Sequence, residues 1–201
     1  MQSFLHGAVL HDSGYFHAWI SSVEGGLFFQ NSEDKAFFMT VLQDNLSPRG
    51  RLAELKLYNS GYSSEIDLLA YSLTTAGVHL LVHTSRRTAI DDLGQVLLLS
   101  YQQHIQQQPD INTVPFDTIF MFDKLVGRHE ALHVSREIHL LHEDWRYDRY
   151  SSIGFYLDDR RGDWIRPYRL TSLFGSKPKQ YLRFLKSQQT ESDRVFEYIE
   201  T

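Results

Sequence analysis

The sequence contains no cysteine among its 201 residues. Disulfides, thiol nucleophiles and zinc sites built on cysteine are therefore all excluded. Long apolar runs are missing as well, because no stretch approaches the roughly 20 residues that a membrane-spanning helix requires. The first residues do not combine a basic segment with a long apolar one, as a secretory signal does. We expect a cytoplasmic protein that makes no contact with membranes.

An overall excess of basic residues is also missing, since 20 Lys and Arg stand against 25 Asp and Glu for a net charge of -5. The acidic excess belongs to residues 1–123, whereas residues 124–201 carry 14 basic and 12 acidic side chains. Within this second part, one run of basic residues consists of Lys177, Lys179, Arg183 and Lys186. Such a cluster indicates either a DNA-binding segment or a solvated helix face.

The spacing of hydrophobic residues changes several times along the first part of the chain. Strands are predicted where apolar positions alternate or form short aromatic and β-branched runs, at Tyr15–Ser22, Ile66–Leu73, Val78–Thr84 and Phe116–Phe122. Helices are predicted where the apolar spacing is close to 3.6 residues, from Ser32 to Ser47 and from Thr88 to Gln106. Because only a short turn separates the two middle strands, we expect them to pair as a hairpin.

This order predicts an α+β protein with a ferredoxin-like βαββαβ plan, in which two helices cover one face of a four-stranded antiparallel sheet. We expect the ferredoxin-like domain to span residues 1–125. Residues 126–201 are predicted to form a mostly helical C-terminal extension, packed on the domain as part of a single compact unit. Helices in the extension are expected to start at Pro167 and Pro178 and to break at Ser151-Ser152 and Gly175-Ser176.

A single histidine, His79, follows the turn in the run LLAYSLTTAGVHLLVHT, residues 68–84. This run resembles the strand-turn-strand of the HUH-type single-strand DNA transposases, the insertion-sequence-200-like group, and especially the REP-associated tyrosine transposases. In that family the second strand carries His-hydrophobic-His after a run such as Leu-Leu-Ala-Tyr-Cys-Leu-Met-Pro-Asn. The chain has Leu-Leu-Ala-Tyr-Ser-Leu-Thr-Thr-Ala at residues 68–76, and then Gly77-Val78-His79.

Other stretches resemble the same family in the same order. Tyr15-Phe16-His17 is similar to its opening strand, and Asp34 to Leu42 to its first helix. Glu137-Ile138-His139-Leu140 resembles its Tyr-Ile-His-Leu-Asn-Pro run, and Tyr150-Ser151-Ser152-Ile153 followed by Tyr156 resembles its Trp-Ser-Ser-x-x-x-Tyr. The resemblance covers roughly residues 14 to 175.

The resemblance implies a metal-dependent nuclease site. In the family, two histidines and a polar residue one helical turn after a tyrosine hold Mg²⁺ or Mn²⁺, while the tyrosine attacks the scissile phosphate. The resemblance assigns Tyr101 as the nucleophile and His79 as a metal ligand, which makes these two the catalytic residues. The chain departs from the pattern at the other ligands, where it has Gly77 and Ile105. His83 does not replace Gly77, because four strand residues place it ~13 Å along from His79.

The resemblance also implies the partner. Single-stranded or hairpin DNA would cross the sheet face, and the basic cluster at Lys177, Lys179, Arg183 and Lys186 would contact phosphates. Some related transposases are dimers in which the tyrosine acts in trans, so a homodimer is a further expectation. Two hypotheses follow: a tyrosine nuclease acting in DNA transposition, or a catalytically inactive relative that binds DNA or a protein.

A third hypothesis comes from His129-Glu130-Ala131-Leu132-His133, which matches the H-E-x-x-H pattern of zinc metallohydrolases. His139 follows ten residues after His129, the spacing of the metzincin proteases. Those enzymes break the helix with a glycine before the third histidine, whereas this chain has Arg136 at that position. If the helix continues, His139 lies roughly 240° around the axis from His133 and ~9 Å along it, too far to share one ion.

Overall fold

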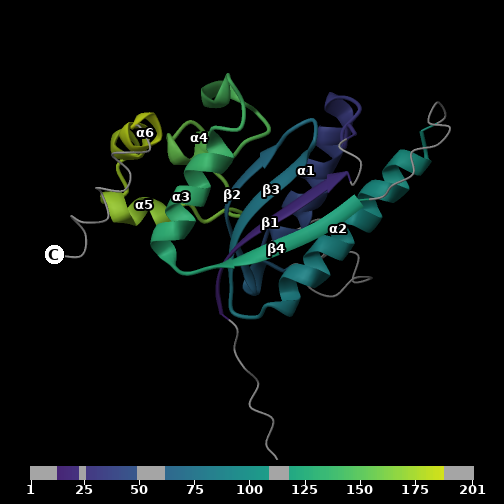
Figure 1. Cartoon of the computed structure of the whole chain (residues 1–201), viewed down its shortest axis with the longest axis horizontal. Coiled ribbons are helices and arrows are strands. Elements are labelled where there is room, and N and C mark those ends of the chain that lie inside the picture. The colour runs from purple at the N-terminus through teal and green to yellow at the C-terminus, as the bar shows by residue number, and fades with distance from the viewer. Residues whose placement is uncertain (1–12, 23–25, 49–61, 109–117, 188–201) are drawn as a thin grey trace, which may run out of the picture.

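The computed structural model describes residues 13–22, 26–48, 62–108 and 118–187. Its centre is a four-stranded antiparallel sheet in the order β2-β3-β1-β4, shown in Figure 1. The strands are β1 (Gly14–Ser22), β2 (Ile66–Leu73), β3 (Gly77–Thr84) and β4 (Thr118–Leu125). Together with the six α-helices of the described residues, this sheet confirms the α+β class.

The strands β2 and β3 pair as the predicted hairpin. Its turn is closed by Thr74, whose side-chain oxygen accepts hydrogen bonds from the backbone amides of Ala76 and Gly77. The central strand β1 pairs with both β3 and β4, and this register places Trp19 opposite His79 on one side and Met121 on the other. Residues that are far apart in the sequence therefore meet on one face of the sheet.

Two long helices, α1 (Ser32–Leu46) and α2 (Thr88–Gln106), cover one face, called here the helical face. Helix α1 begins where the Asn31 side chain accepts hydrogen bonds from the amides of Glu33 and Asp34, as the Asn-Ser signal predicts. The main core lies between these helices and the alternate strand residues that point toward them, among them Phe16, Ala18, Ile20, Val78, Leu80 and Val82. The predicted apolar stripe of α2 is the stripe that is buried.

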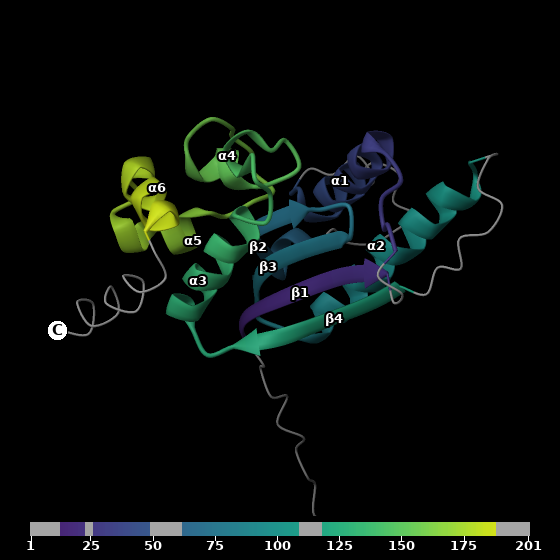
Figure 2. The same cartoon turned by 45° about the horizontal axis from the view of Figure 1, so that its top comes forward.

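The opposite face, called here the outer face, is partly covered by the C-terminal extension. Its helices are α3 (Arg128–His139), α4 (Ile153–Tyr156), α5 (Tyr168–Thr171) and α6 (Pro178–Lys186). A second core joins them to Leu69 of β2 and Leu81 of β3. Figures 1 and 2 show α3 to α6 gathered at one end of the sheet, so these four helices cover only part of the outer face. In the described part of the chain, no helix is both long and apolar enough to cross a membrane.

The helices of the extension are separated by irregular segments. Helices α4 and α5 have four residues each, and only short 3-10 turns, η3 (Trp145–Tyr147) and η4 (Ser172–Phe174), add to them. Some of these irregular segments pair with β2. The amide of Leu73 donates to the carbonyl of Tyr150, and the amide of Arg166 donates to the carbonyl of Leu68. The free edge of β2 is thereby closed by backbone hydrogen bonds.

The last strand also differs from its predicted bounds. Residues 116 and 117 of the predicted strand lie outside the described residues, and β4 continues three residues beyond Phe122 to Leu125. The charged pair Asp123-Lys124 ends the apolar alternation in the sequence, but both residues still pair with β1. An edge strand tolerates such charged side chains because one side of it faces solvent.

Candidate functional site

The two residues assigned to catalysis lie on opposite faces of the sheet. Tyr101 projects from α2 into the core of the helical face, where its side chain is 1% exposed. His79 points to the outer face, because its strand neighbours Val78 and Leu80 point into the helical core. The structure therefore separates Tyr101 from His79 by the thickness of the sheet. Their shared catalytic role stays a prediction, and this arrangement does not support it.

The surroundings of Tyr101 suit a core residue. Its hydroxyl donates a hydrogen bond of 2.8 Å to the carbonyl oxygen of Phe28, and its ring stacks on that of Phe28 with centroids 4.8 Å apart. Burial, and secondarily the charge of Asp34, raises the pKa of Tyr101 far above its ordinary value. Ile105, at the family's polar ligand position, is buried in the same core. A phenol held this way is a poor nucleophile, because the tyrosinate form is strongly disfavoured.

Beside Tyr101, a polar cluster joins α1 to α2. The carboxylate of Asp34 is fully buried, and its Oδ1 lies 3.1 Å from Nε2 of His104 and 2.8 Å from Nε2 of Gln108. The ring of His104 stacks on that of Phe37 with centroids 4.0 Å apart. These contacts satisfy the buried carboxylate and hold the two helices together. They commit His104 to this junction on the helical face.

On the outer face, His79 is paired with a histidine to which the sequence pattern assigns no role. Nε2 of His17 lies 3.2 Å from Nδ1 of His79, and the two rings are stacked with centroids 5.4 Å apart. Trp19 lies beside His17, at a centroid distance of 5.4 Å. Alternation along β1 places His17 and Trp19 on one face, but their contact with His79 depends on the β1–β3 register. The apolar pattern of the separate strands does not give that register.

Both imidazoles of this pair are neutral at physiological pH. Burial lowers the pKa of His17 to about 4, with a further lowering by His79 and an opposing effect of Asp123. Burial also lowers the pKa of His79. A neutral pair of this kind shares one hydrogen bond, in which one ring donates and the other accepts.

These residues do not fit the magnesium or manganese ion that the resemblance implies. Such ions prefer oxygen ligands and need several of them, whereas His17 and His79 offer two nitrogens. Nowhere in the described ranges do three or more His, Cys, Asp or Glu side chains come together in a way that could hold a metal. We therefore derive no reaction step through a metal ion.

The histidine pair belongs to a larger surface, called here the outer-face patch, which consists of His17, Trp19, His79, Ile119 and Met121. The last two project from β4 on the same face as Trp19 and are 37% and 47% exposed. The patch thus combines an indole, two neutral imidazoles and exposed apolar side chains. His17, Trp19 and His79 are half-buried on this face. Flat rings and apolar groups on a partly exposed sheet face are suited to stacking with unpaired bases.

The H-E-x-x-H segment lies on α3, which runs without a break from Arg128 to His139. His139 is fully buried, and its Nδ1 and Nε2 lie 2.8 Å from the hydroxyl of Tyr181 and 2.6 Å from that of Ser152. Both ring nitrogens are thus engaged in the core. Glu130, the expected general base, accepts a hydrogen bond from the amide of Val126. The structure does not bring His139 to a site shared with His133.

The basic cluster is found on α6 and the residue before it. Lys177, Lys179, Arg183 and Lys186 are all exposed, whereas Tyr181, Phe184 and Leu185 are buried against the second core. Because the last three basic residues are spaced at four and then three positions, they share one face of the helix. This core also contains Leu81, so α6 lies on the same side of the sheet as the outer-face patch.

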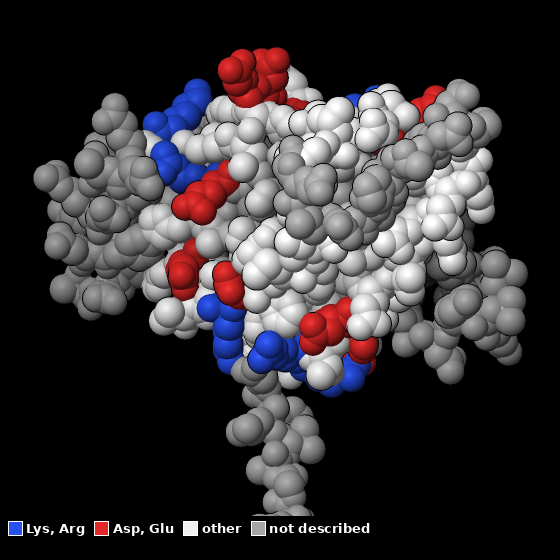
Figure 3. Space-filling view, turned by 45° about the vertical axis from the view of Figure 1, so that its right-hand side comes forward, with Lys and Arg blue, Asp and Glu red and all other residues white. Residues whose placement is uncertain are grey.

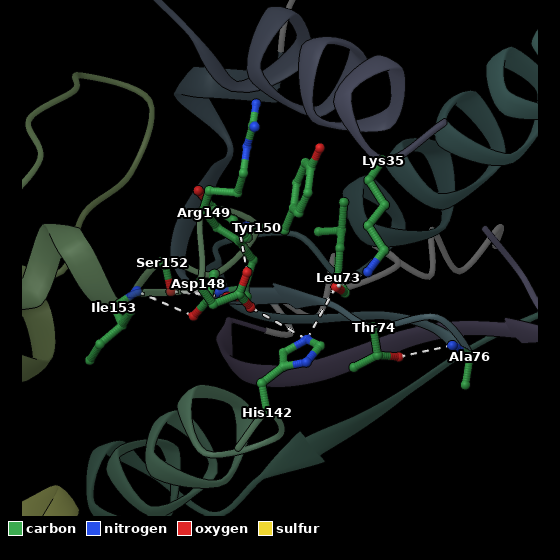
Figure 4. A network of polar contacts seen from close by, with 12 residues as sticks. Lys35, Leu73, Thr74, Ala76, His142, Asp148, Arg149, Tyr150, Ser152 and Ile153 are labelled. Carbon is green, nitrogen blue, oxygen red and sulfur yellow. Dashed lines mark hydrogen bonds and ion pairs between the residues drawn. The ribbon is translucent and has the colours of Figure 1, made fainter. Parts of the chain in front are cut away.

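A polar network fixes the extension to the end of β2, as Figure 4 shows. The carbonyl of Leu73 accepts hydrogen bonds from Nζ of Lys35 at 3.2 Å and from Nε2 of His142 at 3.3 Å. His142 also contacts Oδ2 of Asp148 at 3.4 Å, while Oδ1 of that carboxylate accepts from the amide of Tyr150. The network sets the position of the loop before α4.

No protein-family model matches the sequence, and neither a curated protein nor a solved structure matches the chain. A fold of this class hosts many unrelated functions. Function must therefore be inferred from the side chains that the structure brings together, with the resemblance of residues 14–175 as the only guide to a family.

Proposed function

We propose that the protein binds single-stranded or hairpin DNA across the outer face of its sheet, and that it does so without cleaving the strand. This is the catalytically inactive form of the transposase-like function that the resemblance implies. A ferredoxin-like plan is part of the proposal. It is supported by the chain order βαββαβ and by the sheet order β2-β3-β1-β4 with all neighbours antiparallel.

One observation carries the proposal: the outer-face patch and Tyr101 are on opposite sides of the sheet. A strand lying on the patch would meet Trp19, His17 and His79, but not the phenol that would have to attack its phosphate. Stacking of a base on an aromatic side chain contributes ~1–3 kcal/mol and tolerates any sequence. The geometry therefore favours binding over cleavage.

Phosphate contacts would come from the extension. Lys177, Lys179, Arg183 and Lys186 supply the exposed positive charge on the side of the sheet that carries the patch. Figure 3 shows charged side chains gathered in separate groups, with a largely uncharged described surface between them. The net acidity of the chain is therefore compatible with a local basic contact, because the charges are unevenly distributed.

We expect Trp19→Ala to weaken binding of a fluorescein-labelled hairpin oligonucleotide by about tenfold, because it removes a stacking surface of the patch. The affinity is measured by fluorescence anisotropy at one fixed salt concentration. Leu99→Ala is the matched control, since Leu99 is an exposed apolar side chain on α2, 57% exposed. Equal affinities for the two variants would contradict binding through the patch.

A second arm of the same titration separates stacking from charge. The double variant Lys179→Ala, Arg183→Ala is expected to bind more weakly and to reduce the slope of log affinity against log salt by about one for each phosphate group that it no longer neutralises. Trp19→Ala should leave that slope unchanged. Absence of binding by the unaltered protein would remove the proposal altogether.

A further inference from the structure

A basic and aromatic pocket lies between α1 and the segment that precedes and follows α4. It is an open surface pocket of about 370 Å³, near the lower end of the ~300–1,000 Å³ that is typical of small-molecule sites. The extension lines it with three arginines and three aromatic residues, Arg149, Arg160, Arg161, Tyr150, Phe155 and Trp164, and α1 contributes the opposite wall. No carboxylate lines the pocket in the described part of the chain, although the protein as a whole is acidic.

One of the arginines has a structural task. The guanidinium of Arg160 donates hydrogen bonds to the carbonyl oxygens of Arg149, Asp148 and Ser151, and it lies 5.3 Å from the centre of the Phe155 ring. These bonds hold the chain before α4 in a curve around the guanidinium. Arg160 therefore contributes a positive charge that is held in place beside the pocket.

The other two arginines are exposed at its rim. The guanidinium of Arg149 lies 5.1 Å from the centre of the Tyr150 ring, and Figure 4 shows these two side chains side by side, pointing away from His142. The hydroxyl of Tyr150 donates to the carbonyl of Ser32 at 2.8 Å, which anchors the ring to the start of α1. The guanidinium of Arg149 therefore makes a cation–π contact with an aromatic ring that is itself anchored by a hydrogen bond.

Positive charge beside fixed aromatic rings selects a particular ligand chemistry. A guanidinium matches two phosphate oxygens with parallel N–H groups, and its flat face stacks on planar rings. A nucleotide offers both a phosphate and a planar base, whereas an acidic peptide offers carboxylates without the planar ring. The size of the pocket fits one such unit and not a folded partner.

We propose that this pocket is a subsite for one nucleotide of the bound single strand. Arg149 and Arg161 hold the phosphate, and the base lies against the Tyr150 and Phe155 side of the pocket. The inference rests on the proposed function, because it takes the occupant from the DNA strand. It adds a second contact region, at the edge of the sheet formed by β2 and on the side of α1. A strand that crosses the outer face would reach this region by passing around the β2 edge.

The test uses the full-length protein and two probes, deoxyadenosine monophosphate and the labelled hairpin oligonucleotide. We expect the double variant Arg149→Ala, Arg161→Ala to lose binding of the mononucleotide, followed by NMR chemical shifts, and to bind the oligonucleotide about tenfold more weakly. Arg146→Ala is the matched control, because Arg146 is an exposed arginine beside a tyrosine ring, Tyr147, outside the pocket. It should behave as the unaltered protein does, and Trp19→Ala should keep mononucleotide binding.

The outcomes separate the two proposals. If the double variant binds the oligonucleotide as well as the unaltered protein does, the subsite is wrong and the proposed function stands. If a short polyglutamate peptide displaces the mononucleotide at equal concentration, the pocket recognises negative charge alone and the inference is overturned. If the unaltered protein binds no oligonucleotide, the proposed function and the subsite fall together.

Discussion

Replacing Gly77 by histidine, which restores the first residue of the family's His-hydrophobic-His run, is expected to destabilise the fold and not to create a metal site. A Cβ atom at this position would lie 2.0 Å from the carbonyl oxygen of Ile20 and 3.2 Å from Cα of Ser21. Both are backbone atoms of β1, paired with the start of β3, so they move only if that pairing opens. We expect the free energy of unfolding to fall by about 3 kcal/mol or more.

The measurement is urea unfolding of Gly77→His and Gly77→Ala, with Gly26→Ala as the matched control. Among the described residues, a Cβ at Gly26 would meet Oγ of Ser22 at 3.6 Å, an ordinary contact, so that variant should stay within ~0.5 kcal/mol of the unaltered protein. A Gly77→His protein of undiminished stability, further stabilised by Mn²⁺, would contradict this account. It would show that the strand can accept the family's ligand.

Acidification is expected to unfold the protein between about pH 6 and pH 4, largely through His139. Burial, aided by the charge of Arg160, lowers the pKa of His139 to about 3, whereas the same group in the unfolded chain has its ordinary pKa of 6.5. Below pH 6.5, His139 is therefore protonated in the unfolded state but stays neutral in the folded state until the pH approaches 3. The stabilisation is complete above pH 6.5 and is lost as the pH falls toward 3. By pH 4 the loss from this residue amounts to ~3 kcal/mol.

The free energy of unfolding is measured against pH for the unaltered protein and for His139→Gln. The variant should be less stable at neutral pH, because the hydrogen bonds to Tyr181 and Ser152 are disturbed. Its dependence on pH should nevertheless be flatter, because glutamine does not titrate. His17→Gln is the companion variant: burial lowers the pKa of His17 to about 4, but its place on the outer face predicts a smaller flattening. An unchanged slope in His139→Gln would contradict a neutral buried imidazole.

Local patterns predicted the strands and helices well, because each depends on spacing within one segment. The hairpin, the Asn31 cap and the buried stripe of α2 all follow from residues close together in the sequence. The spacing of apolar residues in α2 and β3 also indicates that Tyr101 and His79 lie on opposite sides of the sheet. The apolar stripe of α2 must pack on the apolar side of β3, and His79 alternates with Val78 and Leu80 on the other side.

Other features depend on contacts that no local pattern contains. The His17–His79 pair requires the register between β1 and β3. The burial of His139 requires Tyr181 and Ser152 to arrive from two distant segments. Within the extension, the segments around Tyr150 and Arg166 pair with β2 through backbone hydrogen bonds that link residues far apart in the sequence. In each case the contact is set by the tertiary structure and not by a local pattern.

The most direct test of the central claim is one incubation of the protein with labelled single-stranded hairpin DNA and Mg²⁺ or Mn²⁺, run on both a native and a denaturing gel. We predict a retarded band on the native gel and no covalent adduct on the denaturing gel. The reason is that Tyr101 is buried on the helical face and its hydroxyl donates a hydrogen bond to the carbonyl oxygen of Phe28. A covalent adduct that disappears in Tyr101→Phe would contradict the account and show that this tyrosine reaches the phosphate.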